Sequence, residues 1–247
     1  MGKQRAGEAT LLEESHLSAM NQWGHPVVGW IPNSQGLGGL HNPRGYGLVR
    51  IVLNKLTEGI LRPLYDQPIL VENAGSIVIA QLGDKVGLIQ NFRMTGDRIL
   101  PVAGADYIRE LQKQNLWSIL ISSLGQWQWE CPRGLIPPSA DNTGNESLED
   151  FALRTAKMEA AEEAGYEITE ARVVGEVNTN PTFFAHSASV VHAKIASIGD
   201  ADHEDLEMIG DSRLFTMGEL RDLCNAGEFK DGLTLSALAL CGLTLPL

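Results

Sequence analysis

The sequence contains no apolar run long enough to span a bilayer, and its polar start, Met1 to Ser18, holds no signal-peptide core. Basic residues are also scarce, because 19 Lys and Arg stand against 31 Asp and Glu and give a net charge of -12. This excess of negative charge argues against a nucleic-acid backbone or an anionic membrane as the main partner. A phosphorylated substrate is still allowed, since bound metal ions can reverse the local field. We therefore expect a cytoplasmic protein that binds neither nucleic acid nor membrane.

Cysteine is rare as well. The 3 cysteines, Cys131, Cys224 and Cys241, show no paired or CxxC spacing, which predicts single buried thiols rather than a disulfide framework. The remaining composition, with 43% apolar and 20% charged residues, is that of an ordinary globular protein. A chain of 247 residues is long enough for one sizeable core with an appendage.

Residues 1–66 are interrupted by glycines and prolines, which favours an N-terminal extension or arm rather than a separate core. Within this extension, Glu8 to Trp23 could form a helix. The apolar alternation from Leu48 to Val52 could begin either a strand or a further helix. The glycines Gly36 to Gly39 are not followed by Lys-Ser or Lys-Thr, so they do not predict a phosphate-binding loop. We place a domain boundary between residues 66 and 67.

Strand patterns follow from Pro68 onwards. Gly83 and Asp84 predict the turn of a hairpin between two apolar runs. A short helical insertion is expected at residues 103–114. The predicted strands are Ile69 to Glu72, Ser76 to Gln81, Val86 to Phe92, Trp117 to Ile121, Trp127 to Cys131, Arg172 to Val177 and Ser189 to Ala196.

One helix is signalled at both of its ends. Ser147 with Asp150 three residues later has the form of a capping box, and Gly165 stands where a left-handed C-terminal cap would lie. A second capping pair, Thr216 with Glu219, predicts another helix near the end of the chain.

Three carboxylates share one face of the first helix. At helical spacing, Glu159, Glu162 and Glu163 continue the stripe of Leu148, Ala152 and Thr155, and Asp150, Arg154 and Lys157 fall opposite. Like charges at this spacing repel, and carboxylates turned toward the protein need a cation. Hard oxygen ligands suit Mg²⁺ or Mn²⁺. The alternative is a solvated acidic face.

The segment Met158-Glu-Ala-Ala-Glu-Glu-Ala-Gly-Tyr166 resembles the second half of the Nudix hydrolase box. Asp150 stands at the place of the first Glu of that box, and Met158 stands at the place of its Arg, which in the family orients the catalytic carboxylates. The opening Gly of the box corresponds to Gly134, or at the formal spacing to Gly144. The tail from His203 to Leu238 resembles the end of the ADP-ribose pyrophosphatase branch.

The resemblance implies a Nudix hydrolase domain over residues 67–247, an α/β/α sandwich around a mixed sheet. Strands on both sides of one amphipathic helix independently favour that helix covering a sheet face. The implied metal ligands for Mg²⁺ or Mn²⁺ are Glu159, Glu162, Glu163 and Gly134, and the glutamates are also the implied catalytic residues.

The same resemblance implies residues that contact the substrate. Arg93 could hold the diphosphate or form a salt bridge at a strand end. The other implied substrate-binding residues are Glu130, Arg133 and Phe183. Glu204 is the implied general base, with Glu207 and His203 as alternatives. Trp127, Trp129, Phe183 and Phe184 could stack a base or pack in the core.

Two functions follow as hypotheses. The first is metal-dependent hydrolysis of a nucleoside diphosphate linked to another moiety, such as ADP-ribose or a nucleotide sugar, which releases a nucleoside monophosphate. The second is a catalytically weak Nudix-like module that binds or senses a nucleotide. A two-fold homodimer is expected, because an arm without its own core would lie on a neighbouring copy.

Overall fold

The computed structural model describes residues 9–10, 18–20, 26–28, 46–57, 60–72, 75–93, 109, 113, 126–135, 146–182, 184–185, 187–203 and 208–245. The chain divides into two compact units. The first comprises Met1–Ser76, Gly134–Phe151 and Glu176–Ser189, and the second comprises Ile77–Arg133, Ala152–Gly175 and Val190–Leu247. The boundary between residues 66 and 67 stays a prediction. Within the described residues, no helix is long and apolar enough to cross a membrane.

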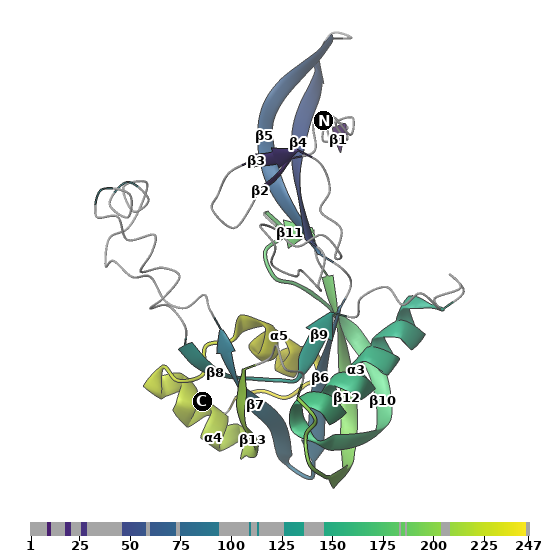
Figure 1. Cartoon of the computed structure of the whole chain (residues 1–247), viewed down its shortest axis with the longest axis vertical. Coiled ribbons are helices and arrows are strands. Elements are labelled where there is room, and N and C mark those ends of the chain that lie inside the picture. Colours follow the sequence, from purple (N-terminus) through teal and green to yellow (C-terminus); the bar gives the residue numbers. More distant parts are fainter. Residues whose placement is uncertain are drawn as a thin grey trace, which may run out of the picture. The chain divides into compact units, whose positions relative to one another are not determined.

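A long antiparallel strand pair dominates the first unit (Figure 1). β4 (Tyr46–Thr57) and β5 (Ile60–Glu72) pair from Tyr46 opposite Glu72 to Thr57 opposite Ile60. The alternation at Leu48 to Val52 therefore belongs to a strand. The sheet order is β1-β4-β5-β11, with β1 at Ala9–Thr10 and β11 at Phe184–Ala185, and β2 (Ser18–Met20) pairs with β3 (Pro26–Val28).

The helix predicted from Glu8 to Trp23 is wrong where the structure describes this segment. Its described parts are the strands β1 and β2. Ala9 pairs with Leu53, and Ser18 pairs with Val28. These partners come from other parts of the chain, and such pairing overrides a weak local helical pattern.

The second unit is built on a mixed sheet with flanking helices, which confirms the α/β fold. The sheet order is β10-β12-β6-β7-β13, with β8 added to β7 and β9 added to β6. The expected hairpin is present, because Gln81 pairs with Val86 across a turn in which Gly83 has φ 63°. The strands are β6 (Gly75–Leu82), β7 (Lys85–Arg93), β8 (Gln126–Glu130), β9 (Arg133–Leu135), β10 (Tyr166–Asn178), β12 (Ser187–Ile198) and β13 (Ile209–Thr216).

Most other sequence predictions about the elements agree with the structure. Arg109 and Lys113, the described residues of the predicted insertion, are both helical. The strand predicted at Trp117 to Ile121 lies outside the described residues. Leu148, expected on the buried face of the first helix, is 75% exposed, because it lies one turn before the first buried alanine of that helix.

The helix α3 (Leu148–Ala164) begins and ends where its sequence signals predict. The Ser147 hydroxyl accepts a hydrogen bond from the Asp150 N–H at 3.1 Å, which caps the first turn. Gly165 ends the helix with φ 67°, and its N–H donates to Ala161 O at 2.9 Å. A Cβ at Gly165 would lie 2.3 Å from the Gly199 carbonyl oxygen, so both backbone conformation and space require glycine.

Small side chains bring α3 close to the sheet. Its buried alanines share one core cluster with residues of β6 and β12. The alanines are Ala152, Ala156, Ala160 and Ala164, and the strand residues include Val78, Ala80, Val191, Ala193 and Ile195. Because the helix approaches closely, Thr155, Glu159 and Glu163 beside this stripe are buried with it.

Two helices close the chain, α4 (Met217–Ala226) and α5 (Gly232–Leu240). The predicted capping box of α4 is present: the Thr216 hydroxyl accepts from Glu219 N–H at 3.2 Å, and the Glu219 carboxylate accepts from Thr216 N–H at 2.8 Å. Asp231 caps α5 through Thr234 N–H at 2.9 Å. Figure 1 shows α3 in front of the sheet and α5 behind it, the two helical layers that a sandwich requires.

Candidate functional site

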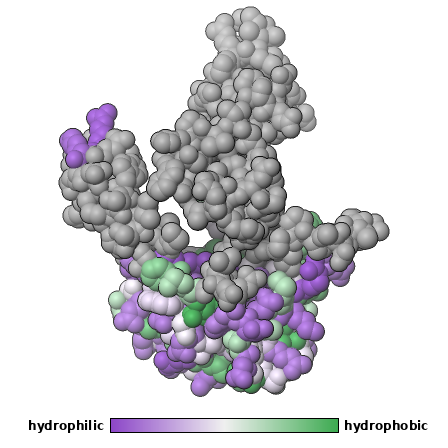
Figure 2. All heavy atoms as spheres, in the orientation of Figure 1, coloured by the Kyte–Doolittle hydropathy of each residue, from purple (hydrophilic) through white to green (hydrophobic). Residues whose placement is uncertain are grey.

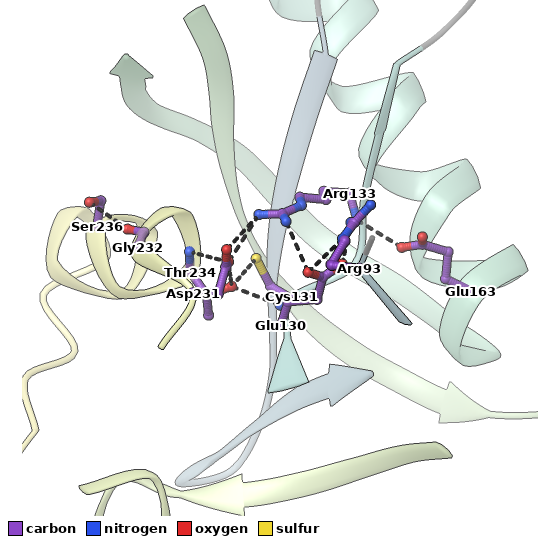
Figure 3. A network of polar contacts seen from close by, with 9 residues as sticks. All are labelled: Arg93, Glu130, Cys131, Arg133, Glu163, Asp231, Gly232, Thr234 and Ser236. Atoms are coloured by element: carbon purple, nitrogen blue, oxygen red, sulfur yellow. Dashed lines mark hydrogen bonds and ion pairs between the residues drawn. The ribbon is translucent and has the colours of Figure 1, made fainter. Parts of the chain in front are cut away.

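Polar side chains meet where several elements of the second unit end (Figure 3). Arg93 ends β7, Glu130 ends β8, and Arg133 begins β9. Glu163 lies in the last turn of α3, and Asp231 lies at the start of α5. Because each residue stands at the end of an element, its side chain is held by a rigid strand or helix.

Glu130 is the centre of this group. Its carboxylate is fully buried and takes hydrogen bonds from two arginines. Arg93 donates from Nε to Oε2 at 3.0 Å and from Nη2 to Oε1, and Arg133 donates from Nη2 to Oε2 at 2.9 Å. A buried carboxylate is tolerated only when it is paired in this way. The pairing also fixes the two guanidinium groups relative to each other.

Arg133 joins Glu130 to the last helix. Its Nη1 donates to both oxygens of Asp231, at 3.1 and 2.9 Å. Burial alone would lower the pKa of the Arg133 guanidinium, but the neighbouring carboxylates of Glu130 and Asp231 outweigh burial and the net pKa shift is upward. Arg133 therefore keeps its charge although its side chain is only 16% exposed.

The segment before Arg133 is held by α5 as well. The buried Thr234 hydroxyl accepts from the Cys131 N–H at 2.9 Å and donates to Asp231 Oδ2 at 2.6 Å. Burial raises the pKa of the Cys131 thiol, so this group stays protonated and is not a nucleophile. The prediction of a single buried thiol is confirmed for Cys131, whereas Cys224 and Cys241 are half-buried free thiols.

The carboxylates of α3 adjoin this network through a backbone contact. Glu163 is 1% exposed, and its Oε2 accepts a hydrogen bond from the Arg133 N–H at 2.8 Å. Glu159, one turn earlier, is 7% exposed, and Glu162 is half-buried. His203 lies at the same end of the helix, with Nε2 3.1 Å from the Glu163 carbonyl oxygen. Two buried carboxylates thus lie at helical spacing beside a cationic residue.

The donor set of α3 fits a hard divalent cation. Within the described residues, no three His, Cys, Asp or Glu side chains form a ready-made metal cluster. Mg²⁺ does not require one, because it is held by one or two carboxylates together with waters and substrate phosphates. Glu159 and Glu163 supply two such carboxylates, and the half-buried Glu162 lies next to Glu163 in the same helix. The metal assignment stays a prediction.

No family model and no curated protein matches the sequence. Among solved structures, an ADP compounds hydrolase superposes with a TM-score of 0.56 at 14% identity, over 97% of this chain and 95% of that chain. A Nudix hydrolase from Nitrosomonas europaea superposes with a TM-score of 0.43 at 14% identity, over 71% of this chain and 93% of that chain. The chain shares the fold of the ADP compounds hydrolase. At 14% identity this likeness concerns the fold alone.

The structure brings together four of the residues singled out by sequence: Arg93, Glu130, Arg133 and Glu163. The salt bridge considered for Arg93 is present, with Glu130 as its partner. Glu159 and Glu162 share α3 with Glu163, and Gly134 is the residue after Arg133 in β9. Phe183, Glu204 and Glu207 lie outside the described residues, so their roles stay predictions.

Sequence reasoning missed the part played by Asp231 and Thr234. Asp231 lies within the tail from His203 to Leu238 that carries the resemblance, but its partner Arg133 lies 98 residues earlier in the chain. An Asp directly before the first residue of a helix is a favoured N-cap, as Asp231 is for α5. Nothing local, however, signals the arginine that shares its carboxylate.

The tryptophans of β8 lie on the other face of the strand from Glu130, because side chains alternate along a strand. Trp127 is 47% exposed and packs edge-on against Phe92, with 5.5 Å between the ring centroids. Trp129 packs edge-on against Phe215, with 4.8 Å between the ring centroids. Both line a cavity of about 370 Å³ together with Gln90, Gln126, Gln128, Gly227, Glu228 and Lys230. Elsewhere, the described surface drawn in Figure 2 is mainly hydrophilic with small apolar groups.

Proposed function

We propose that this chain hydrolyses a nucleoside diphosphate linked to another moiety, with ADP-ribose or a nucleotide sugar as the leading substrates. The products are a nucleoside monophosphate and a phosphorylated moiety. One observation carries the proposal: Glu159 and Glu163 are buried one turn apart on α3, and a backbone N–H of Arg133 holds Glu163. Two carboxylates at this spacing on one helix present oxygen ligands of the kind that Mg²⁺ and Mn²⁺ take.

A divalent cation, Mg²⁺ or Mn²⁺, would neutralise the diphosphate and activate the attacking water when bound. Glu159, Glu162 and Glu163 would hold it, with Gly134 as the further predicted ligand. Burial keeps the Glu159 and Glu163 side chains in fixed positions. Their conformational entropy is therefore lost on folding and not on substrate binding.

Arg93 is suited to bind a phosphate oxygen. A guanidinium has five N–H donors, and Glu130 engages Nε and Nη2, so further donors remain for a ligand. The Arg93 side chain is 29% exposed, whereas that of Glu130 is 0% exposed. Glu130 would therefore act through the two arginines that it orients. Glu204 keeps the proposed role of general base.

The solved ADP compounds hydrolase that shares this fold is named for its action on ADP compounds, which supports testing ADP-ribose first. The purified chain would be incubated with ADP-ribose, ADP-glucose and NADH in Mg²⁺, in Mn²⁺ and in excess EDTA, and released mononucleotide would be measured. We expect release that depends on the divalent metal. Binding of these ligands without any release would contradict hydrolysis and support the nucleotide-binding alternative.

Assembly and location complete the proposal. We infer that the protein is a homodimer and that it is located in the cytoplasm. The dimer is expected because an N-terminal segment interrupted by Gly and Pro would pack against a second copy. Sedimentation at micromolar concentration should give twice the chain mass of 26.8 kDa. A species at 26.8 kDa under these conditions would contradict the dimer.

A further inference from the structure

Three consecutive residues that lead from β8 into β9, Cys131, Pro132 and Arg133, are each held by contacts with other elements. The Cys131 N–H donates to the Thr234 hydroxyl of α5 at 2.9 Å. The Pro132 carbonyl accepts from the Val78 N–H of β6 at 3.0 Å. The Arg133 side chain is shared between Glu130 and Asp231. This segment of backbone therefore has little freedom to rotate.

The same segment points one N–H at the acidic helix. Arg133 N–H donates to Glu163 Oε2 at 2.8 Å, and Glu163 is 1% exposed. The direction of an N–H depends on the backbone dihedrals beside it, which the contacts of residues 131–133 restrain. Contacts from α5 therefore influence the position of the Glu163 carboxylate in α3.

Asp231 is the residue through which α5 exerts this restraint. Its carboxylate accepts from Thr234 N–H at 2.9 Å and from the Thr234 hydroxyl at 2.6 Å, and the same Oδ2 accepts from Arg133 Nη1 at 2.9 Å (Figure 3). Asp231 is thus the N-cap of α5 and also the carboxylate that fixes the position of the Arg133 side chain.

We infer that Asp231 is a positioning residue for Glu163: by fixing Arg133 it holds the Arg133 N–H in place to orient the Glu163 carboxylate for a divalent cation. This inference rests on the proposed function, because it assigns Glu163 to the cation. It gives α5 a role in the site on α3. A partner that orients a metal-binding carboxylate commonly changes metal affinity or turnover by about 10- to 100-fold when removed.

The test uses Asp231→Asn in the full chain. Asn caps a helix about as well as Asp, so α5 should still form while the charge that pairs with Arg133 is lost. We expect Mn²⁺ affinity and kcat to fall about tenfold each, with KM changed by less than about twofold. Hydrogen exchange of the Arg133 amide in metal-free protein should become faster.

The matched control is Glu219→Gln. Glu219 is also a carboxylate in a helix cap that pairs with an arginine, here Arg213 at 3.0 Å, but it belongs to α4. We expect this variant to keep Mn²⁺ affinity, kcat and the exchange rate of the Arg133 amide at wild-type values. Thr234→Val, which removes the acceptor of the Cys131 N–H with little change in shape, serves as a second variant and should behave like Asp231→Asn.

Wild-type Mn²⁺ affinity and a wild-type exchange rate of the Arg133 amide in Asp231→Asn would overturn the inference, whatever happens to thermal stability. If Asp231→Asn does not fold, the same result in Thr234→Val would overturn it. Failure of the proposed function would look different. In that case the wild-type chain itself would release no mononucleotide, while faster exchange of the Arg133 amide in Asp231→Asn would still show that Asp231 positions this N–H.

Discussion

Replacing Glu163 by Gln tests the centre of the proposed site. The change keeps the shape of the side chain and leaves an oxygen that can still accept from the Arg133 N–H, now 2.8 Å from Oε2. What disappears is one negative charge at a position that is 1% exposed, one turn from Glu159 at 7% exposed. The substitution therefore separates charge from packing.

The expected change in stability of the metal-free protein can be worked out from this geometry. Side chains one turn apart lie about 6 Å from each other, and two unit charges at that distance repel by about 3 kcal/mol at an effective dielectric constant of about 20. Replacing the charged acceptor by a neutral one weakens the hydrogen bond from Arg133 by about 1 kcal/mol. The free energy of unfolding should therefore rise by about 1–2 kcal/mol, which raises Tm by about 2–8 °C for a chain of this size.

The effect on function should be opposite in sign. Loss of a charged metal ligand should lower kcat by about 100-fold or more, equivalent to about 2.7 kcal/mol of transition-state stabilisation. Wild-type protein at a Mn²⁺ concentration of about 100 times Kd should gain about 2.7 kcal/mol of stability, and this gain should be absent in Glu163→Gln.

Thermal melts with and without Mn²⁺, together with mononucleotide release, measure all three quantities. Glu149→Gln is the control, because Glu149 is an exposed glutamate in the first turn of the same helix. It should change neither turnover nor the effect of Mn²⁺. Wild-type turnover in Glu163→Gln, or stabilisation of this variant by Mn²⁺ as large as that of the wild type, would show that Glu163 does not bind the cation.

Met158→Arg should raise kcat by less than about threefold, because the Arg133 N–H already holds the nearby carboxylate; steady-state kinetics measure this. Gly87→Ala should lower the free energy of unfolding by about 1–3 kcal/mol in urea titrations. A Cβ at Gly87 would lie 2.2 Å from Cε2 of the buried Tyr166 ring. Burial, with a contribution from a nearby arginine, lowers the pKa of His192 below its ordinary value of 6.5. The unfolded chain then binds the proton more tightly, so stability falls as pH drops below 6.5, and His192→Gln should reduce that slope.

Each of these predictions has a control variant or a result that would contradict it. A tenfold or larger rise in kcat for Met158→Arg would mean that Glu163 is poorly oriented in the wild type, contrary to the structure. Gly232→Ala should be close to neutral, since a Cβ there meets nothing within 4 Å. Equal slopes of unfolding free energy against pH in wild type and His192→Gln would show that this imidazole titrates alike in folded and unfolded chains.

Local signals predicted the helices correctly wherever the signal and its effect lie within one turn. Ser147 caps α3 through the Asp150 N–H, and Gly165 ends the helix in a left-handed conformation. The capping box of Thr216 and Glu219 formed as expected. These contacts join residues that are neighbours in sequence, so the residue types alone specify them.

Predictions failed where a distant partner decided the outcome. The segment Glu8 to Trp23 has a weak helical pattern, but its described residues pair as strands with β4 and β3. The run at Leu48 to Val52 fitted a strand or a helix, and pairing with β5 made it a strand. A short apolar pattern does not distinguish the two, because the energy of a strand comes mainly from its neighbours.

Residue types and their spacing are enough to specify α3 and its acidic face, since the 3.6-residue period places Glu159 and Glu163 one above the other whatever surrounds the helix. The side chains that contact that face depend on long-range packing. Arg93 reaches Glu130 across 37 residues, and Arg133 reaches Asp231 across 98. These contacts depend on the order of the strands and on the docking of α5. Both arise from packing of the whole unit, so local residue patterns do not predict them.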